Sequence, residues 1–172
     1  MKMNFGEKRE SKTSAKVRAL MSQDVRTCRP SDSLHFAARL MWDHDCGCVP
    51  VVDQNLVIGM LTDRDICMAA YMQGRSLPEL TVGGAMSKHV YSCDPDDLLS
   101  AAERMMAAHR VRRLPVIEKG GRLVGILSLS DLAQEATHAS RQNGRDVTRA
   151  EIGKTLIAIC SPASQGEAPP AA

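Results

Sequence analysis

The sequence predicts a mixed α/β (α+β) fold built from two copies of one β-α-β-β-α unit, followed by a short C-terminal helix. Residues 21–50 match residues 86–115 when the chain is shifted against itself by 65 positions, and residues 57–65 match residues 123–131 at a shift of 66. In both copies the hydrophobic spacing changes in the same order, from a helical period to short apolar runs and back. A duplicated unit explains both observations.

The two copies and their flanks divide the chain into four segments. We expect a flexible basic arm over residues 1–16, a first repeat over residues 17–78 and a second repeat over residues 79–137. The extension over residues 138–172 is expected to hold a helix near 148–160 and a disordered tail. The arm is basic because Lys and Arg outnumber Glu there, and the tail is rich in Pro and Ala, with few side chains able to bury apolar surface.

The composition indicates a compact folded protein and argues against several classes. The 172 residues are 44% hydrophobic and 24% charged, which supplies enough apolar material for a core. Charges interrupt the apolar stretches, and the N-terminus is charged where an export signal is apolar. We therefore expect a cytoplasmic protein without a membrane segment, whose six cysteines are reduced and mostly buried. The net charge of +2 gives no argument for nucleic acid.

The first copy opens with a short strand expected around Val25. Residues 30–32 then read as the cap of a helix whose apolar positions recur at helical spacing. Two short apolar runs over residues 49–52 and 57–62 follow, with a polar turn between them, and this pattern predicts a β-hairpin. The second run leads directly into a further helix that is expected to end near Gly74.

The second copy repeats these elements in the same order. A short strand is expected around Val90, and residues 95–97 read as the next helix cap. Apolar runs over residues 114–117 and 123–128 predict a second hairpin, and residues 128–131 open its closing helix.

One further helix is expected outside the repeats. Thr148 and Glu151 have the spacing of a capping box, which marks a helix start. The helix is expected to dock on the module or on a partner. Its apolar side is expected to be formed by Ile152, Leu156, Ile159 and Cys160.

Both copies carry motifs that resemble those of the cystathionine β-synthase (CBS) domain. The motif segments are Met21-Ser22, residues 46–53 and residues 59–65 in the first copy, and Met86-Ser87, residues 112–117 and residues 125–131 in the second. The resemblance covers roughly residues 17–137. It implies a fold in which the two domains pair within one chain, often dimerise into a flat disc, and hold adenosine ligands in the crevices between the repeats.

The strand-to-helix junctions at Thr62 and Ser128 are candidate phosphate sites, because a helix start leaves backbone N–H groups unpaired and carries partial positive charge. The same Thr-x-x-Asp pattern also reads as a capping box that needs no ligand, and the two interpretations are compatible. The resemblance implies that Asp65 and Asp131 hold the ribose hydroxyls, that Thr62 and Ser128 contact phosphate, and that backbone near the first strand of each copy reads adenine. The expected binding residues are Val25, Thr62, Arg64, Asp65, Val90, Arg112, Arg113, Pro115, Ser128, Ser130 and Asp131.

Arg112 and Arg113 distinguish the two copies. Guanidinium groups match phosphate oxygens, and the pair resembles the His-Arg pair that binds phosphate in the gamma subunit of AMP-activated protein kinase. The first copy has Gly47-Cys48 at the aligned positions, with Arg64 as a nearby cation. We therefore expect two unequal crevices, the stronger using the arginines. Whether Asp131 or Asp65 belongs to that crevice stays open, since family crevices draw residues from both repeats.

Other candidate sites carry less weight. The segment with His44, Asp45, Cys46 and Cys48 could hold metal ligands. No second Cys or His pair stands at zinc-finger spacing and Cys46 aligns with an apolar position, so no metal is expected. No set of nucleophile, base and orienting group is found, nor a glycine-rich phosphate loop, so the chain is not expected to be an enzyme.

The sequence thus predicts a regulatory module that senses AMP, ADP or ATP and acts on a regulated protein it does not identify. S-adenosylmethionine and NADH are less favoured ligands. A homodimer is expected, because the family buries its amphipathic helices against a second copy. The alternative is a ligand-free dimerisation or interaction scaffold. A nucleic-acid binder is a weaker third reading, since Phe and Tyr are scarce and no stacking motif is found.

Overall fold

A computed structural model describes residues 15–142 and 148–161, with side chains described as far as Ala136 in the first of these ranges. Most of the predicted basic arm and the predicted tail lie outside these residues. The first half contains η1 (Val17–Ala19), α1 (Leu34–Asp43), β1 (Cys48–Asp53), β2 (Leu56–Thr62), α2 (Asp63–Gln73), η2 (Leu77–Glu79) and α3 (Val82–Ala85). The second half contains α4 (Leu99–His109), β3 (Arg113–Ile117), β4 (Leu123–Ser128), α5 (Leu129–Gln142) and α6 (Arg149–Cys160).

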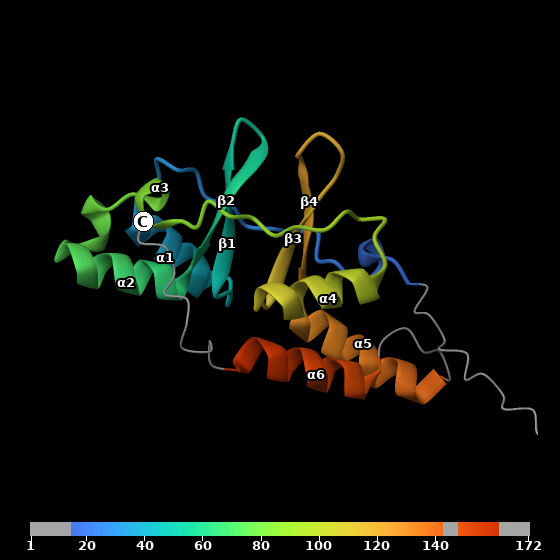
Figure 1. Ribbon diagram of the computed structural model, residues 1–172. Helices are drawn as coiled ribbons and strands as arrows, with labels where there is room; N and C mark the ends of the chain where they lie inside the picture. The colour runs from blue at the N-terminus through green and yellow to red at the C-terminus, as the bar shows by residue number, and fades with distance from the viewer. Residues whose placement is uncertain (1–14, 143–147, 162–172) are drawn as a thin grey trace, which may run out of the picture.

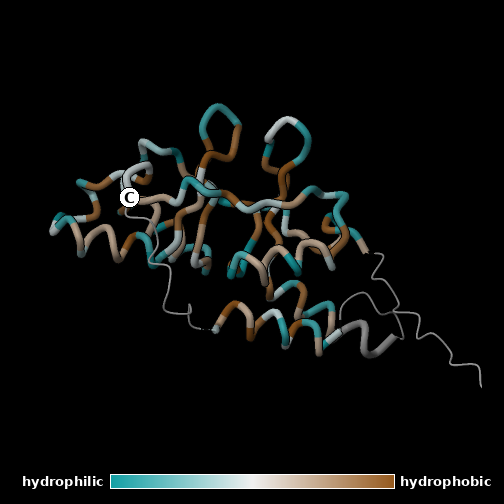
Figure 2. The backbone as a smooth tube through the Cα atoms, in the orientation of Figure 1, coloured by the Kyte–Doolittle hydropathy of each residue, from teal (hydrophilic) through white to brown (hydrophobic). Residues whose placement is uncertain are grey.

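The two predicted hairpins are confirmed as two-stranded antiparallel sheets, β1 with β2 and β3 with β4. In the first, Gln54 and Asn55 both have positive φ, 47° and 67°, which suits the tight turns that match strand twist. The hairpins stand side by side with the larger helices packed below them (Figure 1). The strand stems are mostly apolar and the turns mostly polar (Figure 2), because the stems face the helices and the turns face water.

The helix boundaries follow local capping. As predicted, α2 begins after Thr62 and ends at Gly74, whose φ of 60° is the left-handed conformation that glycine adopts at little cost. The predicted cap of α1 is one residue off. Ser33 is the N-cap and its hydroxyl accepts a 3.2 Å hydrogen bond from the N–H of Phe36. The Asp32 carboxylate instead accepts from the N–H of Arg29, closing the turn before the helix.

The short strands predicted around Val25 and Val90 are wrong. Both residues lie in extended segments outside any strand, and the segments add to the hairpins through single bridges, Cys28 to Val51 and Cys93 to Val116. A proline follows each bridging cysteine by two residues and has no N–H, so the ladder does not continue. Each repeat therefore has one hairpin and two main helices, and an extended segment precedes the first of these helices.

These extended segments cross between the repeats. We call residues 22–28 the first crossing segment and residues 87–93 the second crossing segment. The first begins with a bridge from Ser22 to Ile126 of the second repeat and ends with the bridge to β1 of the first. The second begins with a bridge from Ser87 to Met60 of the first repeat and ends on β3 of the second. The two segments therefore link the hairpins of the two repeats.

Because of this crossing, the packing units differ from the sequence repeats. Val17 is fully buried in the core of the second repeat, whereas Val82 is fully buried in the core of the first. Gly59 shows how closely the exchanged segments approach: a Cβ there would lie 2.6 Å from Sδ of Met86 and 2.8 Å from the carbonyl oxygen of Ser87. Each core is thus completed by a segment that leads into the other repeat.

The predicted C-terminal helix is confirmed as α6, which packs on α4 and α5 and adds a layer beneath the second repeat (Figure 1). Thr148 and Glu151 form the predicted capping box. Ile152 and Ile159 pack on the core, whereas Leu156 and Cys160 are exposed, so the predicted apolar side is only partly correct. None of the described helices is long and apolar enough to cross a membrane.

Candidate functional site

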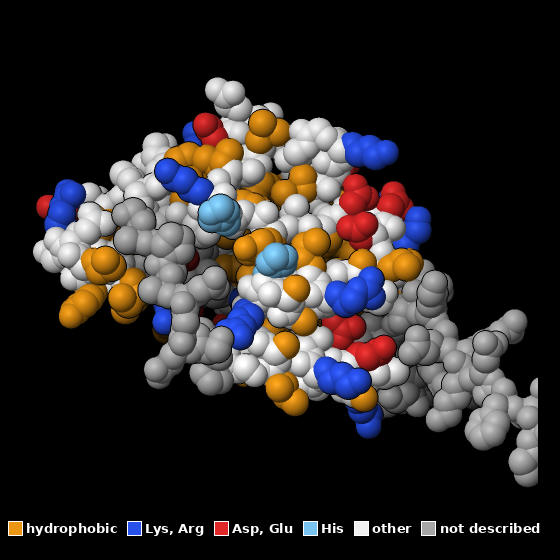
Figure 3. Space-filling model, in the orientation of Figure 1, with side chains coloured by type: hydrophobic (Ala, Val, Ile, Leu, Met, Phe, Trp, Pro, Cys, Tyr) orange, Lys and Arg blue, Asp and Glu red, His pale blue; other side chains and the backbone are white. Residues whose placement is uncertain are grey.

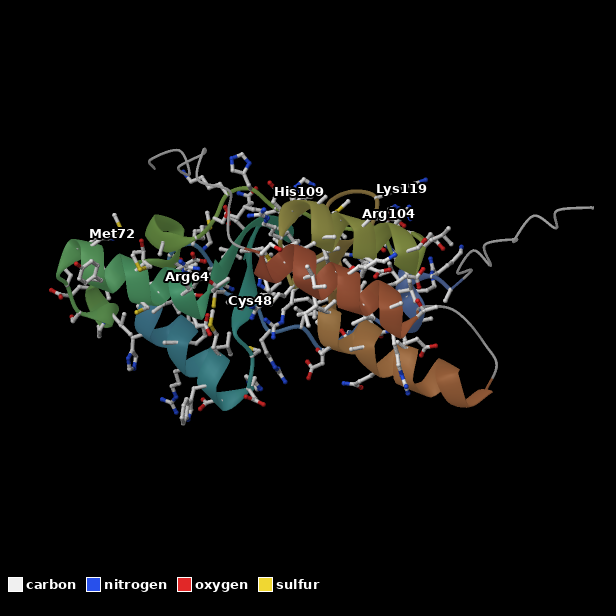
Figure 4. All side chains as sticks on the ribbon, turned by 60° about the horizontal axis from the view of Figure 1, so that its bottom comes forward. Cys48, Arg64, Met72, Arg104, His109 and Lys119 are labelled. Atoms are coloured by element: carbon white, nitrogen blue, oxygen red, sulfur yellow. The ribbon has the colours of Figure 1, made fainter. Side chains whose placement is uncertain are left out.

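A cavity of about 540 Å³, the main cavity, lies between the repeats under the second crossing segment. It is lined by the end of β2 and the start of α2, the crossing segment, the turn before β1, the stretch between α4 and β3, and the end of α6. In Figure 4, Arg64 and Cys48 lie beside that end of α6. The lining residues are Gly47, Cys48, Met60, Thr62, Asp63, Arg64, Asp65, Ser87, His89, Tyr91, Arg110, Val111, Arg112, Arg113 and Ile159.

The charges around the main cavity favour an anion. Four arginines line it against two carboxylates, those of Asp63 and Asp65. Guanidinium groups offer several fixed donors to phosphate or carboxylate oxygens. The arginines are Arg64, Arg110, Arg112 and Arg113.

Asp65 and Thr62 form a reciprocal cap at the start of α2. Oδ2 of Asp65 accepts hydrogen bonds from the N–H of Thr62 at 2.9 Å and from its hydroxyl at 2.7 Å, and the N–H of Asp65 donates to Oγ1 of Thr62 at 3.1 Å. The second repeat repeats this arrangement, with Oδ2 of Asp131 accepting from the N–H and hydroxyl of Ser128 at 2.8 and 2.7 Å. The capping interpretation is therefore confirmed in both copies.

The expectation of unpaired N–H groups at the start of α2 is wrong. The N–H of Asp63 donates to the Gly47 carbonyl at 3.2 Å, and the N–H of Arg64 donates to Oδ1 of Asp63 at 2.7 Å. The N–H of Asp65 donates to Oγ1 of Thr62 in the helix cap. Because these first helical N–H groups already have partners, an anion in the main cavity would depend on the arginine side chains rather than on the helix start.

A smaller cavity of about 240 Å³, the minor cavity, lies under the first crossing segment. Asp24 and Arg26 line it at the positions that align with His89 and Tyr91 in the main cavity. Tyr91 stacks on His109 with ring centroids 3.8 Å apart, so the main cavity has an aromatic wall at this position. The minor cavity is lined by Asp24, Val25, Arg26, His44, Cys46, Cys48, Pro50, Arg113 and Ile126.

Arg113 and Cys48 meet where the repeats join, and the two residues align at the shift of 65. Both line the main and the minor cavity. Burial raises the pKa of the Cys48 thiol, while the charge and hydrogen bond of the Arg113 guanidinium act in the opposite direction. Cys48 is therefore a buried thiol beside the Arg113 guanidinium, and Arg113 borders both cavities.

The two repeats match one family model, described as the CBS domain, at residues 17–71 and 82–138. The chain belongs to the CBS domain family. The resemblance drawn from the sequence motifs is thus confirmed, and the hairpins and cavities described above are those of a CBS pair.

Two relatives align over most of the CBS pair. The CBS domain-containing protein YhcV of Bacillus subtilis (strain 168) is 41% identical over 117 residues, 68% of this chain and 82% of that protein. Hypoxic response protein 1 of Mycobacterium tuberculosis (strain ATCC 25618 / H37Rv) is 32% identical over 147 residues, 85% of this chain and 94% of that protein.

Solved structures give the same fold. A crystal structure of Hypoxic Response Protein I with two coordinated zinc ions has a TM-score of 0.64 at 33% identity, covering 70% of this chain and 98% of that one. The CBS domain pair of protein MJ0100, solved with 5′-methylthioadenosine and S-adenosyl-L-methionine, has a TM-score of 0.63 at 23% identity, with the same coverage. In the described part of our chain, no three His, Cys, Asp or Glu side chains are placed to hold a metal ion.

The CBS pair brings some of the predicted site residues together and separates others. Thr62, Arg64, Asp65, Arg112 and Arg113 line the main cavity, which pairs the arginines with Asp65 rather than with Asp131. Val25 lines the minor cavity. Neither cavity is lined by Val90, Pro115, Ser128, Ser130 or Asp131.

Several lining residues were not predicted. Asp63, His89 and Arg110 each stand one or two residues from a predicted position, so widening each motif would have found them. Ile159 had been placed on the apolar side of the C-terminal helix, but nothing in the sequence connected that helix with the cavity. Its position depends on how α6 packs on the second repeat.

Proposed function

We propose that this CBS pair is a regulatory module that binds an adenine nucleotide (AMP, ADP or ATP) in the main cavity and relays binding to a partner protein. The observation that carries the proposal is the meeting of two segments in that cavity. Thr62–Asp65 comes from the first repeat and Arg110–Arg113 from the second. Ribose acceptors and phosphate donors thus face one space, and a nucleotide needs both.

The residues of the main cavity suit separate parts of a nucleotide. Oδ2 of Asp65 is used by the helix cap, which leaves Oδ1 to accept hydrogen bonds from ribose hydroxyls. Arg112 and Arg113 are positioned to donate to phosphate oxygens. The second crossing segment around Tyr91 offers backbone groups and an aromatic wall to the adenine.

Cavity size supports one nucleotide per chain. Small-molecule sites usually measure ~300–1,000 Å³. The main cavity, at about 540 Å³, lies inside that range, and the minor cavity, at about 240 Å³, lies below it. The excess of arginines also favours phosphorylated ligands over S-adenosylmethionine, whose sulfonium is positive, although a CBS pair of the same fold has been solved with that ligand.

We assign the module a binding role without catalysis, in the cytoplasm and without nucleic acid. Its regulated partner would be a separate protein, whose identity the structure does not show. We also propose that it acts as a homodimer, because the first repeat exposes large apolar side chains on α1 and α2, among them Trp42 and Tyr71.

The alternative function is a ligand-free scaffold, and one observation favours it: the helix start at Thr62 is satisfied by its own residues. Calorimetry and thermal shift with ATP, ADP, AMP, adenosine, S-adenosylmethionine and NADH separate the two functions. A ligand at a hundredfold excess over its Kd stabilises the native state by about 2.7 kcal/mol. No shift with any of the six at millimolar concentration would favour the scaffold.

A further inference from the structure

The two repeats differ in what covers their helices. On the second repeat, α6 packs on α4 and α5, and Thr155 contacts Glu103 of α4. On the first repeat, the corresponding helices α1 and α2 carry an open cavity of about 490 Å³. Ala38, which aligns with Glu103, lines this cavity. The open cavity therefore occupies the place that a helix fills on the other repeat, and we call it the α1–α2 groove.

The surface around the α1–α2 groove is unusually apolar for a surface in contact with water. Trp42, which lines the groove, is 87% exposed, and Tyr71 and Met72 at the end of α2 are 81% and 77% exposed. Figure 3 shows apolar side chains protruding at this end of the molecule. Large apolar patches on a soluble protein mark contact surfaces.

The helix α6 is apolar on both sides. Ile152 and Ile159 face the second repeat, whereas Ile157, on the opposite side, is 68% exposed. Gly153 stands one helical turn before Ile157, and a Cβ there would meet nothing within 4 Å, so a second helix could approach closely. Leu156, which is 47% exposed, adjoins Ile157, and large exposed apolar side chains that lie together mark a contact surface. The outer side of α6 therefore needs a partner.

The shape of the molecule selects the partner's orientation. Figure 1 shows α6 as an additional layer beneath the second repeat, while no helix of the described residues lies beneath α1 and α2. If two copies met with α1 and α2 face to face, the two α6 layers would meet first and hold these helices apart by about two helix diameters of ~10 Å each. If the copies met head to tail, each protruding α6 would enter the recess beside the other copy's α1 and α2.

Charge agrees with the head-to-tail arrangement. Asp45 and Asp63 line the α1–α2 groove against one arginine, Arg113, so its lining carries a small excess of negative charge. Asp43 ends α1 beside the groove, where it forms an ion pair with Arg39. The outer side of α6 presents the exposed Lys154. Opposite charges at the rim guide association and disfavour the pairing of two acidic faces.

We propose that two copies of the chain pair head to tail about a two-fold axis, with α6 of each copy seated in the α1–α2 groove of the other. This inference rests on the proposed homodimer and is independent of nucleotide binding. It assigns a role to α6, which lies outside the residues that match the CBS model. The two-fold axis repeats this contact, so the dimer buries the outer side of α6 and the α1–α2 groove in both copies.

The test measures the dimer dissociation constant of the full chain by sedimentation and light scattering. Ile157→Glu and Trp42→Glu should each weaken the dimer about tenfold or more, because each places a charge in an apolar contact. Both side chains are exposed in one chain, so circular dichroism should show folded variants. Leu56→Glu is the matched control, since Leu56 is 46% exposed and lies on the hairpin side.

Mixing the two variants gives the decisive result. In a mixed head-to-tail pair, one contact joins an unchanged α6 to an unchanged groove, so equal amounts of Ile157→Glu and Trp42→Glu should dimerise better than either alone. Gly153→Gln adds a second variant, which favours the helix but obstructs its outer side, and it should weaken the dimer while the chain stays folded. A monomeric wild type would refute the homodimer itself. A wild-type dimer that resists either Ile157→Glu or Trp42→Glu, or a mixture of the two variants that dimerises no better than each alone, would overturn the proposal.

Discussion

The hydroxyl of Thr155 donates a 2.8 Å hydrogen bond to Oε1 of Glu103, and both side chains are buried where α6 meets α4. The two residues are far apart in sequence, so this bond fixes the position of α6 on the second repeat. Burial raises the pKa of Glu103, and the bond from Thr155 opposes that rise without cancelling it. The docking of α6 is therefore linked to the protonation of one carboxyl group.

The link predicts that the free energy of unfolding falls as pH rises above the ordinary Glu pKa of 4.5. The folded pKa of Glu103 is raised, so the folded state binds the proton more tightly than the unfolded state. Its stabilising effect is complete below the unfolded pKa and is lost as pH rises through the folded pKa. Urea unfolding of wild type and Glu103→Gln between pH 4 and pH 8 tests this. The difference between the two should change over that range, and parallel curves would contradict it.

Removing the donor of this bond should destabilise the docked helix. Thr155→Val leaves the buried Glu103 carboxylate without its partner, at a cost of about 1–3 kcal/mol in the free energy of unfolding. Thr155→Ser keeps the hydroxyl and is the control. A Thr155→Val variant as stable as the wild type would show that the hydrogen bond does not contribute.

The arginines of the main cavity should determine affinity for phosphate. Changing Arg112 and Arg113 together to alanine should weaken AMP and ATP binding ten- to a hundredfold or more, since each charge-assisted hydrogen bond contributes roughly 1.5–3 kcal/mol. Adenosine binding should be little affected. Calorimetry measures both, with Arg104→Ala as the control because Arg104 lines neither the main nor the minor cavity. Unchanged nucleotide affinity in the double variant would exclude the phosphate role.

Asp65 and Asp131 provide a matched pair, because each caps a helix through the same hydrogen bonds. Asp65→Asn and Asp131→Asn should therefore lose similar stability, up to about 2 kcal/mol. Only Asp65→Asn should weaken every ligand that carries a ribose, because Asp65 lines the main cavity and Asp131 does not. If Asp131→Asn caused the larger loss of affinity, the arginines would serve the other crevice.

The cysteines should be free thiols of two kinds, with no stoichiometric metal. Burial raises the pKa of Cys28 to about 11 and of Cys93 to about 12, so these thiols should react slowly at pH 8. Cys67 and Cys160 are exposed and should react first. Timed labelling, thiol counting after unfolding and elemental analysis check this. One tightly bound zinc per chain would contradict it.

Local chemistry alone was enough to predict much of this protein. The duplication, the two hairpins, the end of α2 at Gly74 and the capping box at Thr148 follow from periodicity and from residues a few positions apart. The family followed from the same short motifs. Such features are readable because their interactions lie within one turn of helix or one hairpin.

Only the tertiary structure decided which segments meet. The crossing segments attach through single residues such as Cys28, which leave no periodic signal, yet they place Val17 in the second core and bring Arg112 and Arg113 to Asp65. The position of α6 likewise depends on a buried contact between Thr155 and residues far away in sequence. The sequence indicates the secondary structure of each segment. Which distant residues a segment packs against depends on burial, because those contacts form only when the whole chain has packed.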